Sequence, residues 1–185
     1  KKSLNDLSID KIYVNDLRKI VKIIPLGSKR NIKTISNSLY GGTIEKLTLL
    51  DFNDKNKSRY IATFDDIAIT NTQDRFVGGL SGRVLGDYKK GKLIIDSDDI
   101  EISSGKFNKY KFAEINGLIN YQFNKNVLSL SSHKMIIDKS QYVKVSGVFA
   151  TNKSKLKLKI KGNLNNLINK IFKKKLALIL NQNLS

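Results

Sequence analysis

The chain has 185 residues, a length that suits one domain and leaves little room for two. Hydrophobic residues make up 40% of it and charged residues 27%, so it can bury a core and is not disordered as a whole. With no Cys, disulfides, cysteine-based zinc sites and thiol nucleophiles are excluded. No apolar run approaches the roughly 18 residues of a membrane-spanning helix. Residues 1–6 also lack the apolar stretch of a signal peptide, so we expect the chain as given to be soluble or peripheral.

The formal net charge is +18, from 34 basic and 16 acidic residues. Such a charge suggests nucleic acid or another polyanion as a partner. The five arginines are Arg18, Arg30, Arg59, Arg75 and Arg83, and all the other basic residues are lysines spread along the chain. Because nucleic-acid readers favour Arg, we expect a solvated lysine surface and no nucleic acid, with a polyanion site as a weaker alternative.

Polar and apolar residues alternate in short segments, the pattern of strands with one buried face. In residues 115–124 the odd positions carry Ile, Gly, Ile, Tyr and Phe, while the even positions are mostly Asn and Gln. Residues 156–161 alternate Leu or Ile with Lys. Weaker strand patterns occupy residues 42–50, 60–70, 80–85, 92–102, 127–130, 135–137 and 141–149. Turn residues separate these segments, which predicts a mainly β protein with a largely antiparallel sheet of eight or more strands.

Two segments show the apolar spacing of a helix. In residues 15–24 apolar side chains recur at i, i+3, i+4 and i+7 from Leu17, and Pro25 follows. Residues 164–172 repeat this spacing from Leu164, and a lysine-rich stretch follows. The second segment has the pattern of a basic amphipathic helix on a membrane, but its few aromatic residues favour a helix that caps the end of the sheet.

Two other segments come close to enzyme motifs and miss them. Residues 86–92 approach a phosphate-binding loop, but Leu93 stands where Ser or Thr must reach the metal, and strand patterns flank the segment. A hairpin turn with Lys90 and Gly91 near its tip fits the segment better, with Gly91 at positive φ. The nearest match to a nucleophile elbow has Arg83 in place of its last glycine.

Titratable residues give no pattern of a catalytic or metal site. His133 is the only histidine, and no acid–histidine spacing supports a triad, so we expect it in a turn or on the surface. The pair Asp65 and Asp66 fits a strand break or bulge. The remaining acidic cluster consists of Asp96, Asp98, Asp99 and Glu101. It lacks the glycine and terminal glutamate of a calcium loop, which predicts a strand end whose charge is balanced by Lys89, Lys90 and Lys92. We therefore expect no enzyme, metal or cofactor.

The apolar face of residues 115–124 raises the question of what covers it. Sheets that bind nucleic acid combine aromatic and basic residues on one face. Here Tyr121 and Phe123 share their face with Ile115 and Ile119. Because an apolar face must be covered and two short helices are few for eight strands, two possibilities remain. Either the sheet folds on itself around a closed core, or the face stays partly open for a ligand.

Three strand motifs, taken in order, resemble a known family. Residues 61–67 read IATFDDI, residues 79–87 read GLSGRVLGD, and residues 91–97 read GKLIIDS. Together with GTIEKLTL at 42–49 and INGLINY at 115–121, they resemble the YhdP family of AsmA-like proteins. The likeness extends over roughly residues 7–163.

The resemblance implies an elongated, curved antiparallel sheet that forms an apolar groove, with one or two short helices. Such proteins are long, periplasmic and anchored in the inner membrane by an N-terminal helix. Residues 1–185 would then be a single groove segment of a longer protein, with the anchor outside this chain. The implied function is non-enzymatic phospholipid transport between inner and outer membrane, which supports outer-membrane lipid homeostasis, and the implied partners are phospholipid acyl chains and the membrane.

Alternation supplies the candidates for a lipid-binding groove. They are Ile115, Ile119, Tyr121, Phe123, Val143, Val145, Leu156, Leu158 and Ile160. The same positions would fill a closed core equally well. The alternative function is therefore a closed β-sandwich that serves as a protein-interaction or envelope-assembly module.

Overall fold

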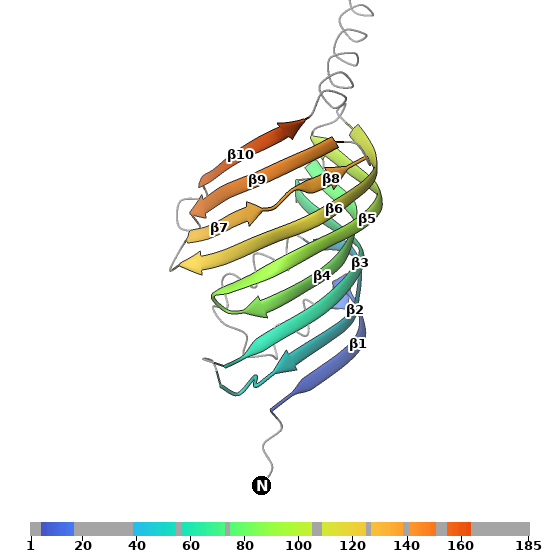
Figure 1. The fold of residues 1–185 in the computed structure, drawn as a ribbon. Coiled ribbons are helices and arrows are strands. Elements are labelled where there is room, and N and C mark those ends of the chain that lie inside the picture. Colours follow the sequence, from blue (N-terminus) through green and yellow to red (C-terminus); the bar gives the residue numbers. More distant parts are fainter. Residues whose placement is uncertain are drawn as a thin grey trace, which may run out of the picture.

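The computed structural model of the chain describes residues 5–16, 39–54, 57–72, 75–104, 109–124, 127–138, 141–150 and 155–163. Their strands form one ten-stranded antiparallel sheet (Figure 1). In chain order the strands are β1 (Leu7–Tyr13), β2 (Leu39–Leu50), β3 (Arg59–Thr72), β4 (Arg75–Asp87), β5 (Lys90–Ser104), β6 (Lys109–Asn124), β7 (Val127–Ser132), β8 (Met135–Ile137), β9 (Gln141–Ala150) and β10 (Lys155–Asn163). From β1 to β7 each strand pairs with the next one along the chain, and β9 pairs with β10. Between them, β7 pairs with β9, and the short β8 pairs with β6 and β9.

The prediction of a mainly β, curved antiparallel sheet is confirmed. Each predicted strand segment falls within an observed strand, and β8 has the predicted bounds. Of the predicted helix at 15–24, the structure describes only the first two residues, which belong to a helical turn at 14–16. The rest of that helix and the predicted helix at 164–172 lie outside the described residues.

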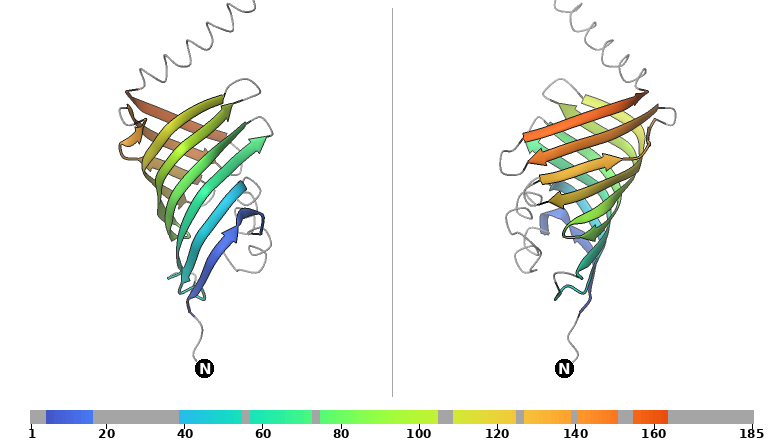
Figure 2. Two further views of the ribbon diagram at one scale, coloured as in Figure 1. Left: turned by 90° about the vertical axis from the view of Figure 1, so that its right-hand side faces the viewer. Right: turned by 60° about the vertical axis from the view of Figure 1, so that its left-hand side comes forward.

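The sheet is open along its edges. Strands β1 and β10 stand at opposite ends of the strand order and are not paired with each other. Figure 2 shows that the sheet twists and curls between them. The described strands thus form one curved sheet, rather than two sheets packed face to face.

A line of left-handed residues marks the place where the strands bend. Each of β1 to β5 carries one residue with φ between +49° and +94°: Lys11, Gly42, Asp66, Gly79 and Asp99. We call these five residues the bulge line. The pairing register shifts near it between β2 and β3, between β3 and β4, and between β4 and β5. Because a bulge bends a strand and increases its twist, a row of bulges on neighbouring strands curves the whole sheet.

Alternation changes phase at this bend. In β5 the odd-numbered residues Ile95 and Ser97 point to one face before Asp99, and the even-numbered residues Ile100 and Ile102 point to the same face after it. The packing of Ile95, Ile100 and Ile102 in one cluster shows this change. The predicted bulge at Asp65 and Asp66 is confirmed, because the register shifts between Phe64 and Ile67.

The interpretation of the acidic cluster as a strand end is wrong. Asp96, Asp98, Asp99 and Glu101 lie in the middle of β5, where it crosses the bulge line. Lys92 cannot balance them closely, because an extended strand separates it from Asp96 by about 13 Å. Glu101 instead forms an ion pair with Lys109 of the neighbouring β6 (Nζ to Oε1, 3.2 Å).

Two apolar clusters lie on the same face of the sheet. The first consists of Ile100, Phe112, Ile115, Met135 and Val143, from β5, β6, β8 and β9. The second consists of Ile12, Leu47, Leu49 and Ala62, from β1 to β3. The paired residues Val84, Leu93 and Ile119 connect them, because Val84 packs against the second cluster and Ile119 against the first. We call this face the inner face.

Candidate functional site

The inner face is built from rows of residues that are paired across neighbouring strands. We call the first the tyrosine row: Leu7, Leu49, Tyr60, Gly86, Gly91, Tyr121, Leu130 and Gly147. Two residues along each strand lies the middle row: Ile9, Leu47, Ala62, Val84, Leu93, Ile119 and Ser132. A third row comprises Ile12, Ile44, Phe64, Gly82, Ile95 and Gly117.

None of the residues in these rows carries a charge. On the opposite face, which we call the outer face, the same strands expose Lys46, Arg83, Lys92 and Lys144. In the middle row, Val84, Leu93 and Ile119 are only partly buried. The inner face is therefore an uncharged, partly accessible surface that continues across the strands, and such a surface favours an apolar ligand.

Four of the predicted lining residues come together in or against the first apolar cluster. Ile115 is 9% exposed and Val143 is 5% exposed, so both belong to the packed core rather than to an accessible surface. Ile119 and Val145 are partly buried and pack against that core. Of these four residues, Ile119 and Val145 are the ones that a ligand can reach.

The aromatic candidates lie on the same side of β6, closer to its end. The rings of Tyr121 and Phe123 meet edge to face, with centroids 6.2 Å apart and an interplanar angle of 69°. The hydroxyl of Tyr121 forms a hydrogen bond with that of Tyr60, which packs against the second apolar cluster. Sequence reasoning missed Tyr60, although it shares an alternating pattern with Ala62 and Phe64 at the start of β3.

The three candidates on β10 are placed by their backbone. Strand β10 sets Leu156 opposite Phe149, Leu158 opposite Gly147, and Ile160 opposite Val145 of β9. Their side chains lie outside the described part of the structure, so their role as lining residues stays a prediction.

The hairpin predicted at 86–92 exists, but its tip is elsewhere. Strand β4 ends at Asp87 and β5 begins at Lys90, so the turn residues are Tyr88 and Lys89. One carboxylate oxygen of Asp87 accepts hydrogen bonds from the N–H groups of Lys89 (2.6 Å) and Lys90 (2.9 Å), which fixes the turn.

The prediction of a positive φ at Gly91 is wrong. Gly91 is already part of β5 and is not among the glycines with positive φ. Glycine is required at this position because the side chain of Tyr121 lies close against its backbone. A Cβ atom on Gly91 would overlap the hydroxyl oxygen of Tyr121, and one on Gly86 would lie 2.5 Å from it.

The two tyrosine hydroxyls share a poorly hydrated environment. Burial is the main reason that the pKa of Tyr121 and the pKa of Tyr60 are both raised above the ordinary value of 10.0. The negative charge of Asp87 raises both further, while the hydrogen bond to Tyr121 opposes the increase at Tyr60. Both side chains are therefore neutral hydrogen-bonding groups at physiological pH.

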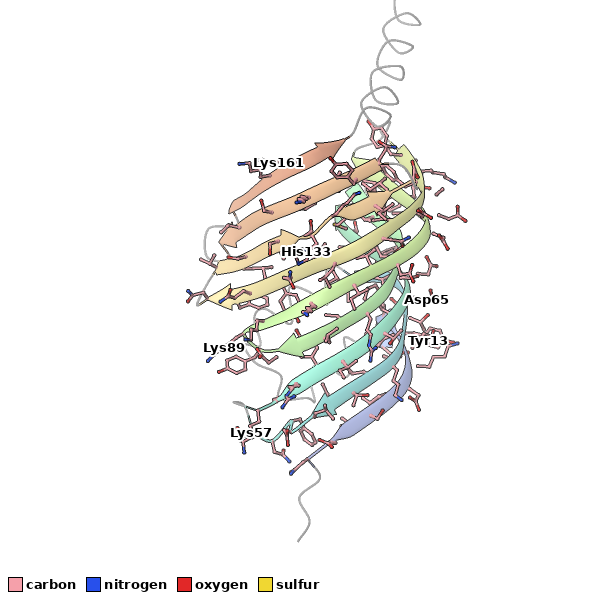
Figure 3. All side chains as sticks on the ribbon, in the orientation of Figure 1. Tyr13, Lys57, Asp65, Lys89, His133 and Lys161 are labelled. Carbon is pink, nitrogen blue, oxygen red and sulfur yellow. The ribbon has the colours of Figure 1, made fainter. Side chains whose placement is uncertain are left out.

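Other candidate groups lie apart from the inner face or do not gather into a site. His133 is exposed, as expected (Figure 3). Among the described residues, no three His, Asp or Glu side chains cluster closely enough to hold a metal ion. In the same part of the chain, no helix has the length and hydropathy needed to cross a bilayer.

No protein-family model matches this chain, and no curated protein or solved structure is significantly similar to it.

Proposed function

We propose that this chain binds phospholipid acyl chains along its inner face and carries them between the inner and outer membranes without catalysis. One observation carries the proposal: three neighbouring rows cross the sheet without a charged residue, while exposed lysines and arginines occupy the opposite face. In a closed core, the residues of these rows would all be buried. Partly accessible residues such as Val84, Leu93 and Ile119 form a surface on which an acyl chain removes apolar area from water.

The resemblance to the YhdP family supports the same function, because its motifs lie in the strands that form this face. Residues 61–67 belong to β3, residues 79–87 to β4, and residues 91–97 to β5. On this proposal the chain is a periplasmic segment of a longer protein, and an anchor outside the chain tethers it to the inner membrane.

The test is to ask whether the protein purified from bacteria carries phospholipid. Native mass spectrometry measures occupancy, and mass spectrometry of an organic extract identifies the lipid. We expect phospholipid in the wild-type protein. A matched pair of neighbouring residues tests where it binds: Leu93→Gln places an amide on the middle row, and Lys92→Gln places one on the outer face.

Leu93→Gln is expected to lower lipid occupancy, whereas Lys92→Gln leaves it unchanged. Circular dichroism checks that both variants keep their strands. A folded wild-type protein without bound lipid would contradict the proposed function, and so would equal occupancy of the two variants.

A further inference from the structure

The tyrosine row contains an unusual arrangement at its centre. Gly86 and Gly91 face each other on β4 and β5, and each has a tyrosine on its other side, Tyr60 on β3 and Tyr121 on β6. The two tyrosines are 61 residues apart in sequence, and their hydroxyls form a hydrogen bond across the two glycine strands.

The glycines make room for this bridge. A Cβ atom on Gly91 would overlap the hydroxyl oxygen and Cζ of Tyr121, so no side chain fits there. The ring of Tyr121 thus occupies the space above the backbone of β5 that a side chain on Gly91 would otherwise fill. The sheet keeps an apolar covering there, and it also gains a pair of hydroxyls on a face that is otherwise almost free of polar side chains.

These hydroxyls have hydrogen-bonding capacity to spare. Two phenols carry two O–H donors, and the bond between them uses one proton. The second proton can be donated to an acceptor oxygen of a ligand. Since burial raises the pKa of both tyrosines, neither loses its proton at neutral pH.

The tyrosine pair lies near one end of the strands, so the polarity of the inner face changes along the strand direction. The tyrosine row lies next to the edge of the sheet where the β2–β3 and β4–β5 turns are found, and Figure 3 shows Lys57 and Lys89 of these turns on that side. The middle row lies about 7 Å further in, two residues along each strand. Across β3 to β6 it presents Ala62, Val84, Leu93 and Ile119. Polarity therefore falls from charged turns to neutral hydroxyls to an apolar row.

We infer that the Tyr60–Tyr121 hydroxyl pair is the polar subsite of the inner face and holds an ester or phosphate oxygen of a phospholipid whose acyl chains lie on the middle row. The inference rests on the proposed function. It commits to a phospholipid because such a molecule offers acceptor oxygens next to long apolar chains, in the order in which the face offers donors and apolar residues. Lys57 and Lys89, exposed on the neighbouring turns, supply positive charge that complements the phosphate.

The test uses the double variant Tyr60→Phe/Tyr121→Phe, which removes both hydroxyls and keeps both rings. Since both partners of one hydrogen bond are removed together, neither is left unsatisfied. Tyr142→Phe is the matched control, because Tyr142 is 39% exposed on β9 and lies on a different row. Two probes are used: phosphatidylglycerol vesicles with a trace of fluorescent phosphatidylglycerol, and the apolar dye N-phenylnaphthylamine.

We expect the double variant to bind phosphatidylglycerol about tenfold more weakly than the wild type, because it lacks the hydrogen bond to the lipid oxygen. Dye binding should stay the same, and Tyr142→Phe should behave as the wild type with both probes.

Equal phosphatidylglycerol binding by wild type and double variant would overturn the inference and leave the proposed function standing. Parallel loss of dye and lipid in the double variant would also overturn it, since the hydroxyls would then serve packing alone. A wild-type protein that binds neither probe would refute the proposed function itself.

Discussion

The side chain of Ser97 on β5 replaces main-chain pairing with Ser81 on β4. Its hydroxyl accepts a hydrogen bond from the N–H of Ser81 (2.8 Å) and donates one to the carbonyl of Ser81 (3.0 Å). The regular pairing of β4 with β5 is interrupted between Gly78 and Gly82, so the N–H and carbonyl of Ser81 have no main-chain partner on β5. The hydroxyl of Ser97 takes the place of that partner. Ser97 is only 2% exposed, and it thus holds two strands together where they cross the bulge line.

Ser97→Ala is expected to lower the free energy of unfolding by about 1–3 kcal/mol, because it leaves a main-chain donor and acceptor unsatisfied in a partly buried place. Urea denaturation followed by circular dichroism measures this. Ser131→Ala, at an exposed position on β7, is the control and should change stability by less than about 0.5 kcal/mol. Similar effects of the two substitutions would show that the hydroxyl of Ser97 does not support the bend.

Gly91→Ala is expected to destabilise the protein by about 1–3 kcal/mol through overpacking, because its Cβ meets the ring of Tyr121 and the carbonyl of Leu85 (2.5 Å). Gly41→Ala is the comparison, since the nearest atom to a Cβ there is that of Ala68 at 3.9 Å. The melting temperature should fall for the first variant and change little for the second. If Gly91→Ala melted like the wild type, the close approach of Tyr121 would be wrong.

Ile119→Asp and Asn120→Asp place the same carboxylate on opposite faces of β6. Asn120 pairs with Lys92 and Ser131 on the outer face, so its replacement should change stability by less than about 0.5 kcal/mol. Ile119 lies on the partly accessible middle row, where a carboxylate keeps some of its water. We therefore expect Ile119→Asp to remain folded and to lose bound phospholipid.

Circular dichroism and lipid extraction read out this pair of variants. Complete unfolding of Ile119→Asp would support a closed core at this position, since a fully buried and unpaired carboxylate costs several kcal/mol. Greater damage from Asn120→Asp would contradict the observed register of β6.

The tyrosine pair predicts a loss of stability in alkali. Both tyrosines have a raised pKa in the folded state, so their contribution is complete below the ordinary value of 10.0 and declines as the pH rises above it. Denaturation at a series of pH values should show a smaller loss above pH 10 in Tyr60→Phe/Tyr121→Phe than in the wild type. Identical pH profiles would mean that the two phenols ionise as freely in the folded protein as in the unfolded chain.

Local sequence pattern was sufficient for the strands and for one of the bends. Alternation of side chains is a property of neighbouring residues, so it predicted the apolar side of residues 115–124 and the bounds of β8. The adjacent acids Asp65 and Asp66 interrupt that alternation, and they predicted the bulge that Asp66 forms.

Other features depended on which strands became neighbours. The sequence pattern missed residues 109–114, the first part of β6. Phe112 and Ile115 are both buried on the inner face although they are three residues apart, so the two-residue alternation changes phase between them, at the bend of the sheet. Asp99 looked like the end of a strand and proved to be a bulge within one. Neither position can be recognised without the neighbouring strands, whose pairing continues on both sides of the bend.

The candidate site was divided in the same way. Sequence determined that Ile119 and Tyr121 share an apolar face, because they lie two residues apart on one strand. Only the tertiary structure decided that Tyr60 meets Tyr121 and that Gly91 must be glycine, because these contacts join strands far apart in the chain. A pattern along one strand carries no information about what lies across the next one.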